Sequence, residues 1–402
     1  MKKSLLTLLL ILGGSLLASA QEITNFTRGA IDNPTINPDK SVTFTFSAPN
    51  AAKVEIEADF LPGKEIDTPN GKMTSTGRVT LPKTAEGVFS WTSEPLKSDL
   101  YTYGVYLDGV KVVDPNNVYQ IRDVANLINY FIIPGGHGDN FDSRDVPHGN
   151  ISKVWYPSPR AKMSQRRMSV YTPAGYNAKD SKRKYPVLYI MHGIGGDENA
   201  WVDGGRLPQV MDNLIASGSA KEMIVVVTNS NMSQKAAPGE YEGSRHRPQL
   251  MVPGNMDGQF EESFLDVLEF VEKTYNVYKD KAHRAIAGLS MGGFHTVYIS
   301  ANNPDLFDYV CPLSAALVNP MGNRDSYIYK DFDAKLDRQF KKAPKLYWIA
   351  CGSADGLIAN NKELMAKMDQ KGYKYTFVES DGGHTWKNWR NYLTQFVPLL
   401  FK

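Results

Sequence analysis

Two patterns of apolar residues divide the chain. Between residues 21 and 134 apolar side chains alternate with polar ones, as in Val42, Phe44 and Phe46. A period of two places every second side chain on one face of a strand, and Asp108-Gly109 is typical of a tight hairpin turn. This part therefore predicts a small antiparallel β-sandwich.

After a glycine-rich segment that we take as a linker, residues 135–149, short continuous apolar runs alternate with amphipathic stretches. Strands buried on both faces and separated by helices are typical of an α/β fold with a mostly parallel central sheet. The expected strands are Tyr185–Met191, Met223–Val227, Arg284–Ala287, Tyr309–Leu313, Leu346–Ala350 and Tyr375–Val378. The expected helices are Leu207–Ser217, Gln259–Tyr275, Met291–Asn302, Asp325–Lys341, Asn360–Lys371 and Trp386–Leu399. Residues 150–402 thus form a second domain.

The first twenty residues have the pattern of an export signal. Lys2 and Lys3 precede an apolar stretch, Leu5–Leu17, and Ala18-Ser19-Ala20 supplies a site of small residues for cleavage. The apolar stretch is shorter than the ~20 residues of a membrane-spanning helix. We expect residues 1–20 to be removed, and the mature chain to be periplasmic or extracellular without a membrane anchor.

Charge and cysteine content exclude several classes of protein. The 402 residues include 45 basic and 43 acidic side chains, and removal of Lys2 and Lys3 leaves the two signs balanced. A neutral chain has no general electrostatic attraction for nucleic acid. Two cysteines, Cys311 and Cys351, are too few for a disulfide scaffold or a cysteine-based zinc site, and their redox state stays open.

A candidate nucleophile lies where an expected strand meets an expected helix. The sequence there is Gly288-Leu289-Ser290-Met291-Gly292, which matches the G-x-S-x-G pattern of a nucleophile elbow. The glycines permit a sharp turn that holds the serine hydroxyl exposed. Ser290 is therefore the expected nucleophile.

A serine nucleophile needs a base and an acid that orients the base. His384 follows the last expected strand, and Asp355 follows the strand before it. The order Ser290, Asp355, His384 is the order in α/β-hydrolases. Asp381 and Glu379 are alternative acids, although a residue so close to His384 in sequence is better suited to shape its loop.

Acyl transfer also requires donors for the negative charge that develops on the carbonyl oxygen. One expected donor is the backbone N–H of Met291, directly after the nucleophile. The second is expected from the glycine-rich loop His192-Gly193-Ile194-Gly195-Gly196, and we favour the N–H of Ile194.

The segments Gly288–Gly293, Tyr189–Asp197 and Gly382–Arg390 resemble carbohydrate esterase family 1, which includes feruloyl and acetylxylan esterases. The resemblance implies an α/β-hydrolase with Ser290, Asp355 and His384 as its triad and with Ile194 and Met291 in the oxyanion hole. Asp99–Tyr103 and Asn129–Phe131 are similar to the family-48-type carbohydrate-binding, immunoglobulin-like module that precedes such esterases.

These features predict an exported serine esterase that removes feruloyl or acetyl groups from xylan and needs neither a metal nor an organic cofactor. Trp201, Tyr241 and Trp386 are candidates to stack on a sugar or phenolic ring, or equally to pack in the core. Two alternatives stay open. One is an esterase or acyltransferase acting on small or siderophore esters, and the other is a glycan-binding protein without activity. The sequence does not indicate the oligomeric state.

Overall fold

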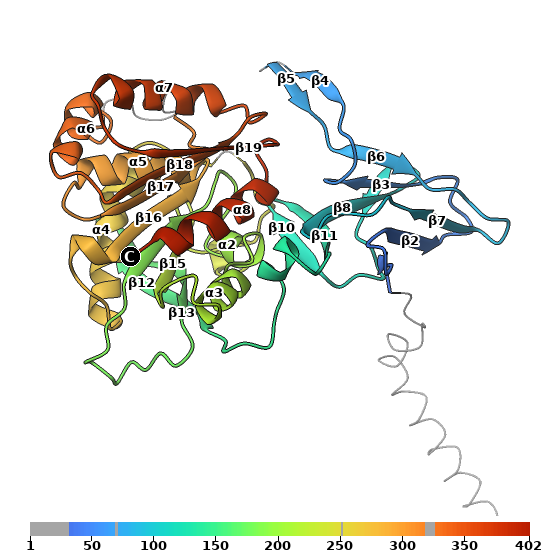
Figure 1. Ribbon diagram of the computed structural model, residues 1–402, viewed down its shortest axis with the longest axis horizontal. Helices are drawn as coiled ribbons and strands as arrows, with labels where there is room; N and C mark the ends of the chain where they lie inside the picture. The colour runs from blue at the N-terminus through green and yellow to red at the C-terminus, as the bar shows by residue number, and fades with distance from the viewer. Residues whose placement is uncertain (1–31, 69–70, 251, 318–325) are drawn as a thin grey trace, which may run out of the picture.

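The fold is taken from a computed structural model, which describes residues 32–68, 71–250, 252–317 and 326–402. The expected export signal at residues 1–20 lies outside these ranges. The described residues form an N-terminal region of antiparallel strands and a C-terminal region built on one large sheet, which lie side by side (Figure 1).

The N-terminal region contains two main sheets. One has the order β1-β2-β7, and the other has the order β10-β11-β8-β3-β6, with β9 paired to β8. Their bounds are β1 Thr35–Ile36, β2 Val42–Ser47, β3 Val54–Ala58, β6 Gly77–Thr80, β7 Val88–Thr92, β8 Leu100–Leu107, β9 Val110–Val112, β10 Gln120–Asp123 and β11 Asn126–Ile132. A separate ribbon pairs β4, Glu65–Thr68, with β5, Gly71–Thr74.

The alternating residues of this region face a shared core. Phe44 of β2, Ile56 of β3 and Tyr103 of β8 are all buried in one cluster, so the two sheets pack against each other. The hairpin predicted at Asp108-Gly109 is confirmed. Leu107 pairs with Val110, and both turn residues have positive φ angles, as the favoured two-residue hairpin turn requires.

The central sheet of the C-terminal region has the order β12-β13-β15-β14-β16-β17-β18-β19. Its strands are β12 Asn150–Ser158, β13 Met163–Thr172, β14 Val187–Met191, β15 Ile224–Thr228, β16 Arg284–Leu289, β17 Tyr309–Leu313, β18 Leu346–Gly352 and β19 Thr376–Ser380. β12–β13 and β13–β15 pair antiparallel, whereas the other pairs are parallel. The sheet is therefore mixed, and the expectation of a mostly parallel sheet is met only in part. The continuous apolar runs predicted its parallel strands, but the half-exposed β12 lacks such a run.

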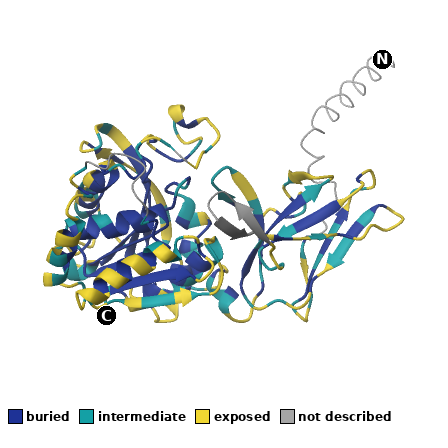
Figure 2. Ribbon diagram, turned by 90° about the horizontal axis from the view of Figure 1, so that it is seen from above, coloured by how far each residue is buried: buried dark blue, intermediate teal, exposed yellow. Residues whose placement is uncertain are grey.

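Helices cover both faces of this sheet (Figures 1 and 2). They are α2 Ala200–Asp203, α3 Leu207–Ala216, α4 Gln259–Thr274, α5 Met291–Asn302, α6 Phe332–Lys341, α7 Ile358–Gln370 and α8 Trp386–Phe396, with short 3₁₀ turns at η2 His137–Asn140, η3 Glu242–Ser244, η4 Lys281–His283 and η5 Val397–Leu399. Successive residues of β14 point to opposite faces. Tyr189 belongs to the hydrophobic cluster that includes residues of α4, α5, α6 and α7, whereas Ile190 belongs to the cluster that includes residues of α2, α3 and α8.

Two helix bounds differ from the sequence prediction by more than two residues, and each has an identifiable reason. The helix expected from Asp325, which lies outside the described residues, begins at Phe332 because Asp331 has a left-handed backbone with φ 52°. The last helix ends at Phe396 and continues as a 3₁₀ turn, since Pro398 cannot donate the next helical hydrogen bond.

Candidate active site

Ser290 lies in the sharp turn between β16 and α5, at the carboxyl end of the central sheet. Its backbone has φ 55° and ψ −116°, a conformation that side-chain-bearing residues rarely adopt. The surrounding backbone fixes this geometry, because the Ser290 N–H donates to the Leu313 carbonyl at 2.9 Å and the Ser290 carbonyl accepts from Ala316 at 3.0 Å.

Two glycines allow this turn to pack so closely. A Cβ on Gly288 would lie 2.4 Å from the backbone of Gly292, and a Cβ on Gly292 would lie 2.4 Å from the carbonyl oxygen of Met191. Real Cβ atoms do not approach backbone that closely. The glycines of the sequence pattern are therefore required by contact between the turn, its helix and β14.

Asp355 and His384 lie together at the same end of the sheet, after β18 and β19. The Nδ1 atom of His384 is 2.9 Å from Oδ2 and 3.1 Å from Oδ1 of Asp355. Their loops are joined by backbone bonds, including Ala354 N–H to the Gly382 carbonyl at 3.0 Å. Of the three candidate acids, the structure brings Asp355 to the imidazole.

Asp355 is held as a carboxylate. Its side chain is buried, and burial alone would raise its pKa. Hydrogen bonds from His384 and from the Leu357 N–H, together with electrostatic attraction to His384, outweigh burial and lower the pKa. His384 itself is partly exposed, and its ring lies perpendicular to that of Trp389 at a centroid distance of 4.8 Å. A fixed anion therefore orients one nitrogen of an accessible imidazole.

The loop of residues 193–196, which we call the oxyanion loop, reaches Ser290. A Cβ on Gly193 would lie 3.1 Å from Cβ of Ser290, so glycine permits this approach. Met291 is the first residue of α5, and its N–H is one of those that a helix leaves without an intrahelical acceptor. The two expected backbone donors therefore belong to the start of α5 and to the loop that approaches Ser290.

His192 fixes one end of this loop, a role that sequence reasoning did not assign. Its Nε2 accepts from the Ser230 N–H at 2.9 Å, so the proton is on Nδ1, which donates to the Gly193 carbonyl at 2.7 Å. Burial lowers the pKa of His192 to about 4, so the ring is neutral. Because the peptide is trans, the Ile194 N–H points away from His192.

A cavity of about 610 Å³ opens onto these groups. Ser290, His384, Gly193 and Ile194 line it from the C-terminal region. The N-terminal region contributes the opposite wall, with side chains that include Asp59, Thr102, Lys111, Ile121, Arg122, Asp123 and Val124. Sequence reasoning missed this second wall, because no local pattern shows which strands of one region approach the other.

The three aromatic candidates differ in position. Trp386 lines the cavity, so it is placed to meet a ligand. Trp201 is 0% exposed and donates its indole N–H to the Met191 carbonyl at 2.9 Å, so of its two possible roles the structure shows packing in the core and not contact with a substrate. Tyr241 precedes η3, packs against Gly243 and is not among the residues that line the cavity.

Other candidate chemistry is limited in the ranges that the structure describes. No group of three or more His, Cys, Asp or Glu side chains there could hold a metal ion. No helix in those ranges has both the length and the apolar character needed to cross a membrane. Cys311 and Cys351 are buried and free, and burial raises the pKa of both thiols.

Comparisons with known proteins agree with this architecture. A family described as "Putative esterase" matches residues 161–400. The chain is 28% identical over 377 residues to an endo-1,4-beta-xylanase/feruloyl esterase of Xylanibacter ruminicola, covering 92% of this chain and 46% of that protein. The chain thus spans less than half the length of that relative.

Solved structures show the same fold. A ferulic acid esterase superposes with a TM-score of 0.51 at 28% identity, covering 63% of this chain and 97% of its own. The enterobactin esterase of Shigella flexneri gives 0.62 at 14% identity and covers 90% of this chain and 93% of its own, so the likeness extends to the fold of both regions.

Proposed function

The chain belongs to the family described as "Putative esterase", and we propose that it is a serine esterase with Ser290, His384 and Asp355 as its catalytic triad. One observation carries the proposal. Asp355 binds Nδ1 of His384 at 2.9 Å, while His384 and Ser290 line the same cavity. A histidine that is oriented by a carboxylate and shares a cavity with a serine can serve as the base for the serine hydroxyl.

In the first half of the reaction, Oγ of Ser290 attacks the ester carbonyl carbon and Nε2 of His384 takes its proton. The backbone N–H groups of Met291 and Ile194 stabilise the negative charge on the carbonyl oxygen. The bond to the alcohol oxygen then breaks, and His384 returns the proton to that oxygen. Asp355 stabilises the transient imidazolium and stays ionised.

In the second half, His384 takes a proton from water, and the hydroxide oxygen attacks the acyl-enzyme. The bond between the acyl carbon and Oγ of Ser290 breaks, and His384 returns the proton to Oγ. Acid and unmodified enzyme result, and no step requires a metal or an organic cofactor.

The substrate we propose is a feruloyl or acetyl ester on xylan. Support comes from the names of the Xylanibacter relative, which include xylanase and feruloyl esterase, and of the ferulic acid esterase structure. The cavity suits such a ligand, since it combines Trp386 with the polar side chains Asp59 and Lys111. An aromatic face and surrounding hydrogen-bonding groups are what a phenolic or sugar ring requires.

We also propose the organisation of the whole chain. Residues 1–20 act as the export signal, and residues 21–134 form an immunoglobulin-like module related to carbohydrate-binding modules. Residues 135–149 connect this module to residues 150–402, which form the catalytic domain. The packed antiparallel sheets of the N-terminal region support the second assignment. The basic, apolar and small-residue pattern at the N-terminus supports export to the periplasm or the medium.

The test measures hydrolysis of methyl ferulate and p-nitrophenyl acetate by the mature chain and by Ser290→Ala. Loss of the nucleophile should lower kcat by roughly 10⁴-fold or more on both esters. Ser300→Ala is the matched control, because Ser300 is a buried serine on the same helix and bonds only within it. Its kcat should stay close to that of the parent.

Each outcome has a clear meaning. Ferulate release that requires Ser290 supports a feruloyl esterase. Acetate release alone contradicts the feruloyl part and leaves an acetyl or small-ester esterase. Equal rates for Ser290→Ala and the parent would overturn the triad.

A further inference from the structure

We propose that the end of the β10–β11 hairpin, residues 122–126, is a positioning element of the active site. In this segment, which we call the β10–β11 turn, Arg122 and Val124 hold the oxyanion loop in place. The proposal rests on the function proposed above, because it assigns a role to Ile194 as an oxyanion donor. It concerns the rate of acyl transfer on any ester, apart from any binding of glycan by the N-terminal region.

The backbone of the turn is strained at Val124. This residue has φ 52°, in the left-handed region. A β-branched side chain is a clear outlier there, since its Cβ crowds the backbone. Strain of this kind persists only where the surroundings determine the conformation, and it concentrates at functional sites. The contacts of Val124 are therefore informative.

The strained valine packs directly on the oxyanion loop. Gly195 has φ +77°, and the position of its missing Cβ lies 2.8 Å from Cγ2 and 2.9 Å from Cγ1 of Val124. The two methyl groups thus occupy the space above the glycine. A displacement of the loop toward the N-terminal region would collide with them.

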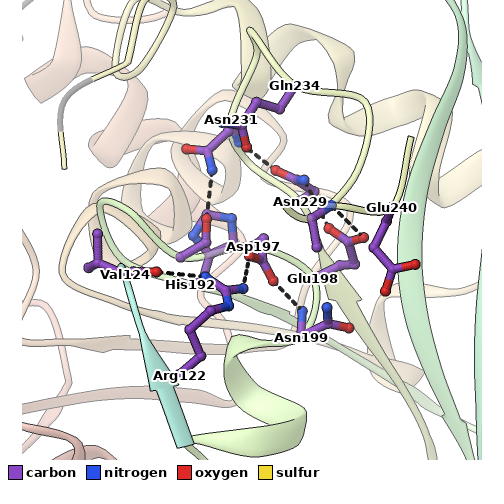
Figure 3. A network of polar contacts seen from close by, with 12 residues as sticks. Arg122, Val124, His192, Asp197, Glu198, Asn199, Asn229, Asn231, Gln234 and Glu240 are labelled. Atoms are coloured by element: carbon purple, nitrogen blue, oxygen red, sulfur yellow. Dashed lines mark hydrogen bonds and ion pairs between the residues drawn. The ribbon is translucent and has the colours of Figure 1, made fainter. Parts of the chain in front are cut away.

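Arg122 attaches the same turn to the residue that follows the loop. Its Nη1 donates to the Val124 carbonyl at 2.8 Å, and its Nη2 forms an ion pair with Oδ2 of Asp197 (Figure 3). The Asp197 side chain is 1% exposed, and its Oδ1 accepts the Asn199 N–H at 2.9 Å. The guanidinium therefore fixes the turn and the end of the loop to each other.

The remaining attachments of the loop come from the C-terminal region. His192 donates to the Gly193 carbonyl, and Nδ2 of Asn231 donates to the Gly196 carbonyl at 2.6 Å (Figure 3). Three of the four loop residues are glycines, which restrict the backbone least of all residues. The geometry of the Ile194 N–H consequently depends on these contacts, and two of them come from the β10–β11 turn.

The turn also reaches the other side of the catalytic centre. Oδ1 of Asp123 accepts the indole N–H of Trp386 at 3.3 Å, and Trp386 lies two residues after His384. One short turn thus contacts both the oxyanion loop and the segment that carries the base. A glycan-binding module attached only as a spacer would not require either contact.

The test uses p-nitrophenyl acetate, which has no sugar for the N-terminal region to bind. Val124→Gly removes the methyl groups and adopts the positive φ angle without strain, and Arg122→Ala removes the ion pair. For both variants we expect kcat to fall about 10- to 100-fold, with KM changed less than threefold, because small misplacement of a transition-state donor lowers the rate. The Tm of Val124→Gly should stay equal or rise, which a merely structural role would not produce together with a lower kcat.

Arg160→Ala is the matched control. Both arginines form an ion pair with a buried aspartate, and the side-chain exposures are similar: 35% and 1% for Arg160 and Asp266, 28% and 1% for Arg122 and Asp197. Arg160, however, is not among the residues that line the cavity. Its kcat should stay within twofold of the parent. If Arg122→Ala does not fold, Arg122→Lys and Val124→Gly decide the outcome.

The failure of this inference differs from failure of the proposed function. If Ser290→Ala abolishes activity while Val124→Gly and the Arg122 variant keep kcat within twofold of the parent, the positioning role is wrong. A rise in KM at constant kcat would also overturn it. If Ser290→Ala retains activity, the proposed function itself is wrong.

Discussion

Ser290, Asp355 and His384 are three residues whose places could be predicted because each follows the end of an apolar strand. Parallel strands bring their carboxyl ends to one edge of the sheet, so local sequence was enough to expect the three near each other. Trp201 and Tyr241 could not be placed in the same way. Whether an aromatic ring lines a cavity or packs in the core depends on residues distant in the sequence, and Trp201 is buried in the core.

Asp355→Asn should retain the fold and lose most of its activity. The amide cannot stabilise an imidazolium, so kcat on p-nitrophenyl acetate should fall about 10³- to 10⁴-fold.

The pKa of Asp355 is lowered by the fold, so its carboxylate stabilises the protein at neutral pH, and that contribution is lost as the pH falls below about 4. The Tm difference between parent and variant should therefore be largest at pH 7 and smaller at pH 3. A constant difference would contradict the ionised Asp355.

The buried, neutral His192 should make the folded chain less stable at acidic pH. Its pKa is lowered from 6.5 to about 4, so the unfolded chain binds a proton more readily than the folded chain does. The contribution of neutral His192 to the free energy of unfolding is fully present above pH 6.5. It declines as the pH falls toward 4, by up to about 3 kcal/mol. Denaturant unfolding at pH 7 and pH 4.5 should show this loss in the parent, and a smaller loss in His192→Gln, which does not titrate. Equal losses would show that His192 is not buried as a neutral ring.

At the scale of elements, the turn between β16 and α5 shows which features local sequence can specify. The G-x-S-x-G pattern predicted a strand, a sharp turn and a helix, and α5 has the predicted bounds, Met291–Asn302. The strands β12 and β13 were not predicted as elements of the central sheet. β12 is largely exposed and mixes polar with apolar residues, so it lacks the continuous apolar run of the buried strands.

Gly292→Ala tests the packing of this turn. The added methyl would lie 2.4 Å from the Met191 carbonyl oxygen, so β14 or α5 must shift. We expect a loss of about 1–3 kcal/mol in stability and a large loss of kcat, measured by denaturant unfolding and ester hydrolysis. Gly356→Ala is the control, since nothing lies within 4 Å of its added methyl. Parent-like activity in Gly292→Ala would show that the turn tolerates a different geometry.

At the scale of the whole molecule, the N-terminal and C-terminal regions share one hydrophobic cluster. Leu100 and Tyr130 of the N-terminal sheets are buried together with Trp389 and Tyr392 of α8. Arg390, fully buried, also donates to the carbonyls of Leu100 and Gly204. The change of period near residue 150 indicated two regions, but it gave no sign that they are packed into a common core.

This shared cluster predicts cooperative unfolding. Separating the two regions would expose apolar residues and leave the Arg390 guanidinium without its carbonyl partner in β8, so neither region is expected to melt alone. Scanning calorimetry of the mature chain should give a single transition whose calorimetric and van't Hoff enthalpies agree. Two separate transitions would show that the regions are independent.

Covalent labelling tests whether Ser290 is an activated nucleophile. A fluorophosphonate reacts with a serine whose hydroxyl is deprotonated by a neighbouring base. Peptide mass spectrometry after labelling should find one modified residue, Ser290, with no labelling of Ser290→Ala and slow labelling of Asp355→Asn. Modification of a different residue, or no modification of the folded parent chain, would show that Ser290 is not the nucleophile.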